Sequence, residues 1–513
     1  MRLTNHDLKQ IDRDYLASLS PEQLLNLSGK MLDDLRDARD RLNQTPQNSS
    51  RPSGSYAPWE QATFSDKEKE SDAPDETATT APPPKEKEKP ESDKLGSDKE
   101  DKGQRKAGKQ PGSKGVGRRV ELAVTGEVVH QPLECAACGH LFAADVPFQK
   151  TTGRYVLDIE QVAYGLQVTH VKHLYGQRTC PCGHVTESKP GRCPEEPEWD
   201  VALTEWHLVG PLLCSLIICL SLRMRLSRPR IKEFLQDWLL ISLSTGCINQ
   251  CITEGGRAVA PLEDELVAEI QASDLLHADE TGWKESGRTL WLWVLRTATV
   301  TLYLIGSRSW TVIADVIEAF GGWLMSDGYG QYRHYGKRLR CLAHILRKAR
   351  GLAESSHPAA AKFGQKVLEY LGRFIQGIYA ARGDPQLDLV EKFASDLAQL
   401  QALCAAHRDH THDKTRQLAR ELLNDWEAIW RVLAHPTLPI TNNVAERALR
   451  HWVIARKISY GTRSADGSRA YALLASVIDT CRQRHISPWP YLAQVIAARR
   501  QGNAAPSIPQ PVR

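Results

Sequence analysis

Apolar side chains recur along the chain in two patterns, one helical and one strand-like. Helical spacing runs through Leu24–Leu42, 211–259 and 358–432. Tyr155–Val171 alternates in strand fashion instead, and short apolar runs follow one another over 275–344. Alternation and short apolar runs predict strands, whereas a spacing of three and four residues predicts helices. The pattern therefore predicts a multidomain α/β protein.

The N-terminal segment, residues 1–44, is predicted to contain an amphipathic helix. Ser20–Gln23 forms a capping box with proline at the first helical position. Apolar residues then follow at mixed three- and four-residue spacing: Leu24, Met31, Leu35, Ala38 and Leu42. Because this stripe spans less than three heptads, it is compatible with a dimeric coiled coil and equally with packing on the rest of the chain.

Residues 45–119 are predicted to form a disordered linker. Lys85–Pro90 and Asp98–Lys102 alternate charges and contain almost no apolar residues. Such a composition cannot offset the entropy that is lost on ordering. The end of the segment, Lys102–Arg119, carries lysines and arginines and no acid. It is either an arm that contacts phosphates or a solubilising tether.

Two cysteine pairs in residues 120–200 predict a small β-rich zinc module. One pair has C-x-x-C spacing, the other has C-x-C spacing, and each is followed by Gly-His: the four residues are Cys135, Cys138, Cys180 and Cys182. Four thiolates can close a tetrahedral structural zinc site. C-x-C is the less usual spacing for a zinc site. His140, His184 or Cys193 is therefore an alternative ligand in place of one of the four cysteines.

Residues 201–270 are predicted to be helical. A helix over Ile231–Leu240 is followed by a turn, and Ser244 can cap a second helix that begins at Thr245. This order resembles a helix-turn-helix, whose second helix would enter the major groove of DNA. Ordinary helical packing explains the pattern slightly better.

Composition and charge limit the class of protein. Of the 513 residues, 41% are hydrophobic and 25% are charged, which suits a mostly globular chain, and the net charge is only +4. No signal peptide follows Met1, and the most apolar stretch, Val209–Leu222, is shorter than the ~18 residues that span a bilayer. We therefore expect a reducing, cytosolic location, in which the 12 cysteines are ligands or core residues rather than disulfides.

Acidic residues at the ends of predicted strands mark the segment 271–500. Strands are predicted to end at Asp279 and Asp327, with two more strands and a helix over Trp310–Phe320 between them. Three antiparallel strands followed by alternating helix and strand suggest a mixed sheet covered by helices. A helical insertion over 358–435 then precedes Glu446, which opens a basic helix.

Asp279, Asp327 and Glu446 can act together on phosphodiesters. Three acids from separate elements can hold two Mg²⁺ ions about 3.5–4 Å apart, and carboxylates are the hard ligands that Mg²⁺ prefers. Each acid also has a structural explanation. Asp279 can cap a strand end, Asp327 can begin a turn, and Glu446 can complete a capping box that begins at Asn443.

Further polar clusters lie near these acids. Four cations follow Glu446 and are predicted to contact DNA phosphates, although a solvated helix face also explains them: Arg447, Arg450, Arg456 and Lys457. Within the insertion, one cluster has ligand-like spacing but polar neighbours that favour a solvated helix end: Cys404, His407, His410 and His412.

Several motifs, in this order, resemble the transposases of the insertion sequence 66 family. They are His277–Thr281, Ser326–Tyr329, Cys341–His344, Asn442–Arg450, Gly461–Ser464 and Pro488–Leu492. These transposases belong to the DDE superfamily and have an RNase H-like core. The resemblance implies that Asp279, Asp327 and Glu446 form the acidic triad, and that the four cysteines named above bind zinc. The chain departs from the family in its C-x-C pair and at Ile458–Tyr460, where relatives have an asparagine-led aromatic run.

The resemblance implies a bacterial, nucleoid-associated DNA transposase that nicks the ends of its element and joins the freed 3′-hydroxyls to target DNA. It implies two Mg²⁺ or Mn²⁺ ions per active site and one structural Zn²⁺. Double-stranded DNA, further copies of the chain and element-encoded helper proteins are the expected partners, with no membrane. A structure-specific nuclease and a non-catalytic zinc-dependent DNA-binding regulator stay open as alternatives. A two-carboxylate glycosidase is more distant, because it needs neither a metal nor a basic helix.

Overall fold

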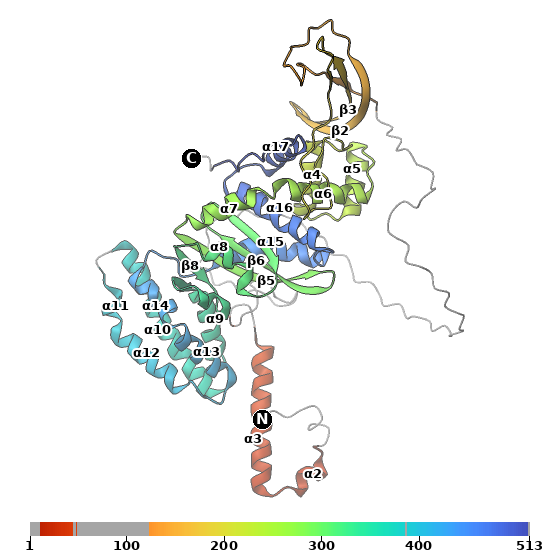
Figure 1. Ribbon diagram of the computed structural model, residues 1–513. Coiled ribbons are helices and arrows are strands. Elements are labelled where there is room, and N and C mark those ends of the chain that lie inside the picture. Colours follow the sequence, from red (N-terminus) through yellow and green to blue (C-terminus); the bar gives the residue numbers. More distant parts are fainter. Residues whose placement is uncertain (1–10, 45–47, 49–122, 385–386, 511–513) are drawn as a thin grey trace, which may run out of the picture. The chain divides into compact units, whose positions relative to one another are not determined.

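A computed structural model describes residues 11–44, 48, 123–384 and 387–510 (Figure 1). The predicted linker, residues 45–119, lies outside these described residues apart from Asn48. The described chain contains two mixed β-sheets and many helices, which confirms the predicted α/β class.

The N-terminal helices are α2 (Arg13–Ser18) and α3 (Pro21–Leu42). The predicted capping box of α3 is present, because Ser20 and Gln23 each accept a hydrogen bond from the other's backbone N–H. No residue of α3 is buried, and Leu35 is 67% exposed. The apolar stripe is therefore not covered by the rest of the described chain, and α3 contacts it through polar groups such as Asp40, which accepts from the Ser356 backbone at 2.9 Å.

The first sheet carries the cysteine pairs. Its strands are β1 (Gly126–His130), β2 (Gln149–Val162), β3 (Gly165–Thr179) and β4 (Val185–Glu187). β3 pairs in parallel with β1 and antiparallel with β2 and β4. The alternating segment Tyr155–Val171 is thus two strands of one hairpin. The chain reverses just before Gly165, whose φ of +128° only glycine adopts easily.

Four helices follow: α4 (Pro211–Leu222), α5 (Arg228–Leu239), α6 (Thr245–Val259) and α7 (Leu262–Gln271). The predicted cap of α6 is present, since the Ser244 hydroxyl accepts from the backbone N–H of Cys247 at 3.2 Å. Every residue from Glu254 to Val259 is buried. This burial favours ordinary helical packing over a recognition helix that is free to enter a DNA groove.

The second sheet contains β5 (Leu275–Glu285), β6 (Arg288–Arg296), β7 (Thr301–Gly306), β8 (Trp323–Ser326) and β9 (Arg338–Arg340). Their order is β7-β6-β5-β8-β9, with β5, β6 and β7 antiparallel and β8 and β9 parallel to β5. This arrangement confirms the predicted mixed sheet. One detail was wrong: β5 does not end at Asp279 but continues to Glu285, because β6 pairs with it along that whole length.

The predicted helix over Trp310–Phe320 was also wrong in extent. The segment forms a 3₁₀ turn, η1 (Trp310–Val312), and a single helical turn, α8 (Ala314–Ile317). The β-branched run Thr311-Val312-Ile313 disfavours a continuous helix. A second 3₁₀ turn, η2 (Gly330–His334), follows β8.

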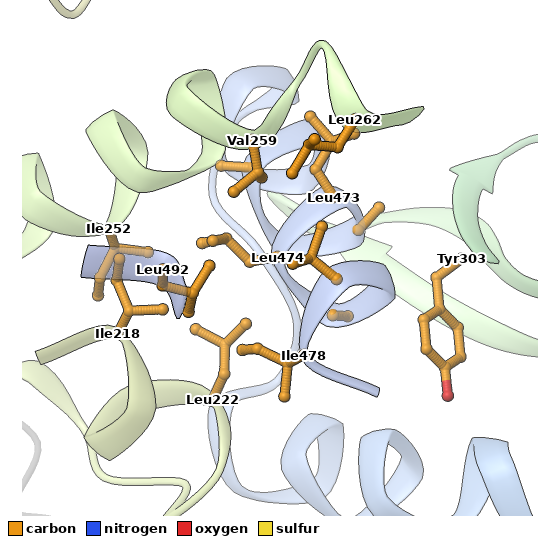
Figure 2. Close-up of a cluster of buried hydrophobic side chains, with 14 of the residues drawn as sticks. Ile218, Leu222, Ile252, Val259, Leu262, Tyr303, Leu473, Leu474, Ile478 and Leu492 are labelled. Carbon is orange, nitrogen blue, oxygen red and sulfur yellow. The ribbon is translucent and has the colours of Figure 1, made fainter. Parts of the chain in front are cut away.

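Helices α15 (Asn443–Ser459), α16 (Ala465–Gln483) and α17 (Pro488–Arg500) complete this part of the chain. Side chains of α16 accept hydrogen bonds from the edge strand β7: Ser476 from the Tyr303 N–H at 2.8 Å, and Thr480 from the Thr301 N–H at 3.1 Å. These bonds protect an edge that could otherwise pair with another strand. Leucine and isoleucine side chains of α4, α6, α16 and α17 share one core (Figure 2).

The insertion is helical as predicted and has its own core. Its helices are α10 (Pro358–Gly383), α11 (Leu389–Lys392), α12 (Ala394–Ala406), α13 (Asp413–Asn424) and α14 (Trp426–Ala434). Helix α9 (Leu342–Ala353), which precedes the insertion, packs in the same core. Buried ion pairs join it to the sheet, because Asp425 lies 2.6 Å from Arg338 and 3.1 Å from Arg340 of β9. The insertion is thereby attached to the same sheet that carries the candidate acids.

Candidate active site

The parallel strands β5 and β8 place Asp279 and Asp327 side by side. His277 of β5 lies opposite Met325 of β8, and two more residues along each chain lead to the two aspartates. Neighbouring strands are about 4.8 Å apart, and the charge of Asp327 acts on Asp279 strongly enough to raise its pKa, so the two carboxylates lie near each other. Two adjacent anions with oxygen donors are the ligands that a divalent cation such as Mg²⁺ prefers.

The electrostatic state of Asp279 reflects this crowding. Burial raises the pKa of its carboxyl well above the ordinary range, and the nearby charges of Asp327, Glu280 and Glu446 raise that pKa further. A metal cation would reverse the effect, since an opposite charge stabilises the ionised carboxylate. The arrangement is therefore costly as a set of anions alone and suits a cation.

Backbone N–H groups orient both aspartates. Oδ1 of Asp279 accepts from the N–H of Glu280 at 2.9 Å, and Oδ1 of Asp327 accepts from the N–H of Tyr329 at 2.8 Å. The second contact is the turn that the sequence suggested as a structural role for Asp327. Each bond uses one carboxylate oxygen and fixes the direction of the other, so the turn and a metal-binding role are compatible.

Glu446 does not belong to a capping box. The N-cap of α15 is Asn442 rather than Asn443, and the side chain of Asn442 makes no capping hydrogen bond. Its amide nitrogen donates to the carbonyl oxygen of Ala278 at 2.8 Å, and its Oδ1 lies 3.1 Å from Nδ1 of His277. The capping explanation of Glu446 is therefore wrong, because the cap residue is used to attach α15 to β5.

Glu446 lies close to two residues at the start of α9, Cys341 and His344. The possible ligand atoms of Cys341, His344 and Glu446 all lie within 4.8 Å of one another. Oε1 of Glu446 is 3.6 Å from Nε2 of His344 and accepts from Arg347 at 3.3 Å. Burial, with the charge of Arg347, lowers the pKa of His344 to about 4, so its imidazole is neutral at pH 7. Within the described chain, the three acids do not form one group of this tightness.

The four predicted zinc ligands do come together. Sγ of Cys135 lies 3.7 Å from Sγ of Cys182, Sγ of Cys138 lies 3.6 Å from Sγ of Cys180, and all four sulfurs lie within 4.8 Å. Sulfurs bound to one zinc ion at about 2.3 Å in a tetrahedron are about 3.8 Å apart. The residues present therefore fit a zinc ion.

The Gly-His sequences after each cysteine pair shape the two knuckles. The N–H of Cys135 donates to the carbonyl of His140 at 2.8 Å, and the N–H of Cys180 donates to that of His184 at 2.9 Å. The intervening glycines, Gly139 and Gly183, have φ of +68° and +87°. Neither histidine belongs to the sulfur group, and Cys193 is buried in the main core. The C-x-C pair thus supplies both of its own ligands.

Comparison with known proteins identifies the family. Residues 207–470, slightly more than half of the chain, match the family described as "Transposase IS66 family". The chain belongs to this family. The match contains Asp279, Asp327, Glu446 and the whole helical insertion.

Relatives in Sinorhizobium fredii (strain NBRC 101917 / NGR234) carry no assigned activity. The uncharacterized protein y4qI is 25% identical over 299 residues, which covers 52% of this chain and 56% of y4qI. The uncharacterized protein y4jO is 29% identical over 169 residues, which covers 33% of this chain and 50% of y4jO. The chain thus spans about half the length of the curated relatives that it matches. No described helix is both long and apolar enough to cross a membrane.

The sequence analysis missed a fourth carboxylate, Glu280. It accepts hydrogen bonds from the Tyr332 hydroxyl and from Nη2 of Arg308, each at 2.8 Å. Burial and the charge of Asp327 raise the pKa of Glu280. The guanidinium of Arg308 lies between the rings of Trp291 and Tyr329, 3.9 and 4.0 Å from their centres. The sequence signal that could have found Glu280 is its position directly after Asp279 in the His277–Thr281 motif.

The predicted DNA contacts of α15 divide into two groups. Arg447, Arg450 and Lys457 are exposed. Arg456 is half-buried, and it donates to Oγ1 of Thr281 at 3.1 Å and to the carbonyl of Gly282. Its guanidinium holds α15 against β5, which the sequence did not predict.

The spacing of Cys404, His407, His410 and His412 suggested one group of metal ligands, but these four residues do not form such a group. Cys404 is buried in the insertion core, and burial raises the pKa of its thiol to about 12. His412 caps α13 and lies instead near two residues that are distant in sequence. The possible ligand atoms of Asp37, His357 and His412 lie within 4.8 Å of one another. Sequence spacing could not indicate this group, because its members come from separate segments.

Proposed function

We propose that this family member is a DNA transposase that nicks the ends of its element and joins the freed 3′-hydroxyls to target DNA. Asp279, Asp327 and Glu446 would hold two Mg²⁺ or Mn²⁺ ions on an RNase H-like core. The observation that carries the proposal is the side-by-side placement of Asp279 and Asp327, in which burial and mutual repulsion favour a bound cation.

When bound, the ions would lower the pKa of the attacking water or 3′-hydroxyl and stabilise the leaving 3′-oxygen. The chain's own residues prepare the site for them. The backbone N–H groups of Glu280 and Tyr329 orient the two aspartates. Asn442 holds the start of α15 against β5, and Arg347 holds the carboxylate of Glu446. These contacts restrict the carboxylates before any substrate arrives.

Two other parts of the chain would serve DNA binding. The four cysteines would hold one structural zinc ion and stabilise the first sheet. Arg447, Arg450 and Lys457 would contact phosphates, while Arg456 would contribute by positioning α15. The exposed apolar stripe of α3 is compatible with a homo-oligomer on DNA. Helper proteins encoded by the element stay part of the proposal.

The test is a cleavage and strand-transfer assay on DNA that carries the element's ends. Asp279→Asn, Asp327→Asn and Glu446→Gln should each nearly abolish Mg²⁺-dependent cleavage and leave DNA binding largely intact, because each change removes one metal-binding charge. Asp274→Asn is a matched control, since Asp274 is exposed and precedes β5. Cleavage without joining would indicate a nuclease. Binding by the unmodified protein without any cleavage would indicate a non-catalytic regulator.

A further inference from the structure

A cavity of about 700 Å³ lies where the start of α5, the end of α15 and the start of α16 meet. The loops at its wall include two non-glycine residues in the left-handed region, Arg225 with φ of 58° and Tyr460 with φ of 59°. Such backbone is costly for these residue types and is retained where the surrounding structure requires it. The cavity is distinct from the acidic site at the other end of α15.

The wall of the cavity carries more positive than negative charge. Arg225, Arg228 and Arg463 line it, against the acids Asp200 and Asp466. Within the described chain, none of the three arginines lies within 4.0 Å of a carboxylate oxygen. Arg228 makes only a long contact with Asn249, at 3.5 Å, and burial lowers the pKa of its guanidinium. A partly desolvated cation without an acidic partner favours an anionic ligand.

Two helix N-termini open onto the same cavity. Ser227 caps α5 and Ser464 caps α16, and both residues line the wall. These helices have 12 and 19 residues, long enough for a substantial partial positive charge at each start. Free backbone N–H groups at a helix start bind phosphate oxygens well. The helix termini and the arginines therefore point to the same kind of ligand.

Aromatic residues add a second kind of contact. The hydroxyl of Tyr471 is buried in the wall of the cavity and has no hydrogen-bond partner among the described residues. A ligand with an acceptor oxygen would satisfy this donor. Tyr460 lies at the cavity and is 77% exposed, which leaves its ring available for stacking against a base or sugar.

Helix α15 links the cavity to the proposed active site. On an ideal helix, Arg450 and Lys457 lie within about 40° of Glu446, so they share one face. Glu446 and Ser459 are about 20 Å apart at a rise of ~1.5 Å per residue. That distance corresponds to roughly six nucleotides along one DNA strand. Three residues of α15 line the cavity, and they lie on other faces of the helix: Ala455, Ile458 and Ser459. A strand that follows the Glu446 face would therefore have to turn around the end of α15, at Tyr460, to enter the cavity.

We infer that the cavity between α5, α15 and α16 binds the DNA phosphate backbone roughly six nucleotides from the cleaved phosphodiester, through Arg225, Arg228 and Arg463. This inference rests on the proposed function and adds a specific contact that positions the strand. It assigns to the Gly461–Ser464 motif a role in phosphate binding, since this motif forms one wall of the cavity.

The test measures binding of end-containing DNA to Arg228→Ala and Arg463→Ala proteins in EDTA, over a range of salt concentrations. Each change should weaken binding roughly tenfold and reduce the slope of log affinity against log salt by about 0.9. Arg230→Ala is the matched control, because Arg230 is exposed on the same helix as Arg228 and does not line the cavity. Arg228→Lys should restore part of the binding, and unchanged melting temperatures would show that the variants fold.

Phosphate-ethylation interference gives the position of the contact. Ethylation of one or two phosphates roughly six nucleotides from the cleavage site should block binding by the unmodified protein and have less effect on Arg228→Ala. Unchanged affinity and salt slopes in both alanine variants, with intact cleavage, would overturn this inference and leave the proposed function standing. Binding of inorganic phosphate in the cavity without any interference signal would overturn it too. Failure of the unmodified protein to bind or cut end DNA would instead reject the proposed function.

Discussion

The side-chain amide of Asn442 donates a hydrogen bond to the carbonyl oxygen of Ala278 at 2.8 Å, one residue before Asp279. The two residues are 164 positions apart and belong to the N-cap of α15 and to strand β5. Glu446 lies one helical turn after this cap. The bond therefore fixes the third proposed catalytic acid relative to the first.

Asn442→Ala should lower the cleavage rate more than it lowers DNA affinity. The change leaves the buried carbonyl of Ala278 without its donor, which costs about 1–3 kcal/mol of stability. Asn443→Ala is the control, because Asn443 is exposed at the next position. Equal cleavage rates for the two variants, measured at saturating DNA, would contradict a positioning role for Asn442.

Asp279→Asn should stabilise the metal-free protein at neutral pH. The folded-state pKa of Asp279 is raised above its unfolded value, so the protonated form stabilises the fold at low pH. That contribution is lost as pH rises through the raised pKa, whereas asparagine is neutral throughout. In EDTA the variant should melt a few degrees higher than the unmodified protein near pH 7.5, with the difference shrinking toward pH 4. Mg²⁺ should reduce this difference in melting temperature. A difference that changes with neither pH nor Mg²⁺ would argue against a cation site.

The purified protein should contain about one zinc ion per chain. Cys135→Ser or Cys180→Ser should remove most of it and destabilise the first sheet, because structural zinc binding contributes directly to folding. Cys247→Ser serves as the control, since Cys247 lies on α6, outside the sulfur group. Full zinc content in both ligand variants would place the metal elsewhere, with Asp37, His357 and His412 the next group to change.

Arg450→Ala and Lys457→Ala should each flatten the salt dependence of DNA binding by roughly one counterion. Metal affinity should stay unchanged, because neither side chain belongs to the acidic group. Lys366→Ala is a suitable control, since Lys366 is exposed on the insertion and pairs with Glu369. If both α15 variants keep the slope of the unmodified protein, this face of α15 does not follow the DNA strand.

The sequence by itself determined features that depend on short-range patterns. Three kinds of feature follow from residues within a few positions of one another: the two Cys-pair knuckles, the capping box at Ser20 with the helix cap at Ser244, and the alternation of strands. The helical insertion likewise follows from the apolar spacing within its own segment. These predictions agree with the structure because turn chemistry and periodicity act within single elements.

Only the tertiary structure decided how distant side chains are used. Asn443 was expected to cap the helix that carries Glu446, and Arg456 was expected to contact DNA. Instead Asn442 is the N-cap residue, and the side chains of Asn442 and Arg456 both bond to β5. The cavity between α5, α15 and α16 likewise combines segments more than 200 residues apart. The local sequence pattern indicates which face of a helix or strand is apolar, but it does not indicate which other element packs against that face. The partner of a polar side chain is therefore fixed only when the sheet and its covering helices assemble.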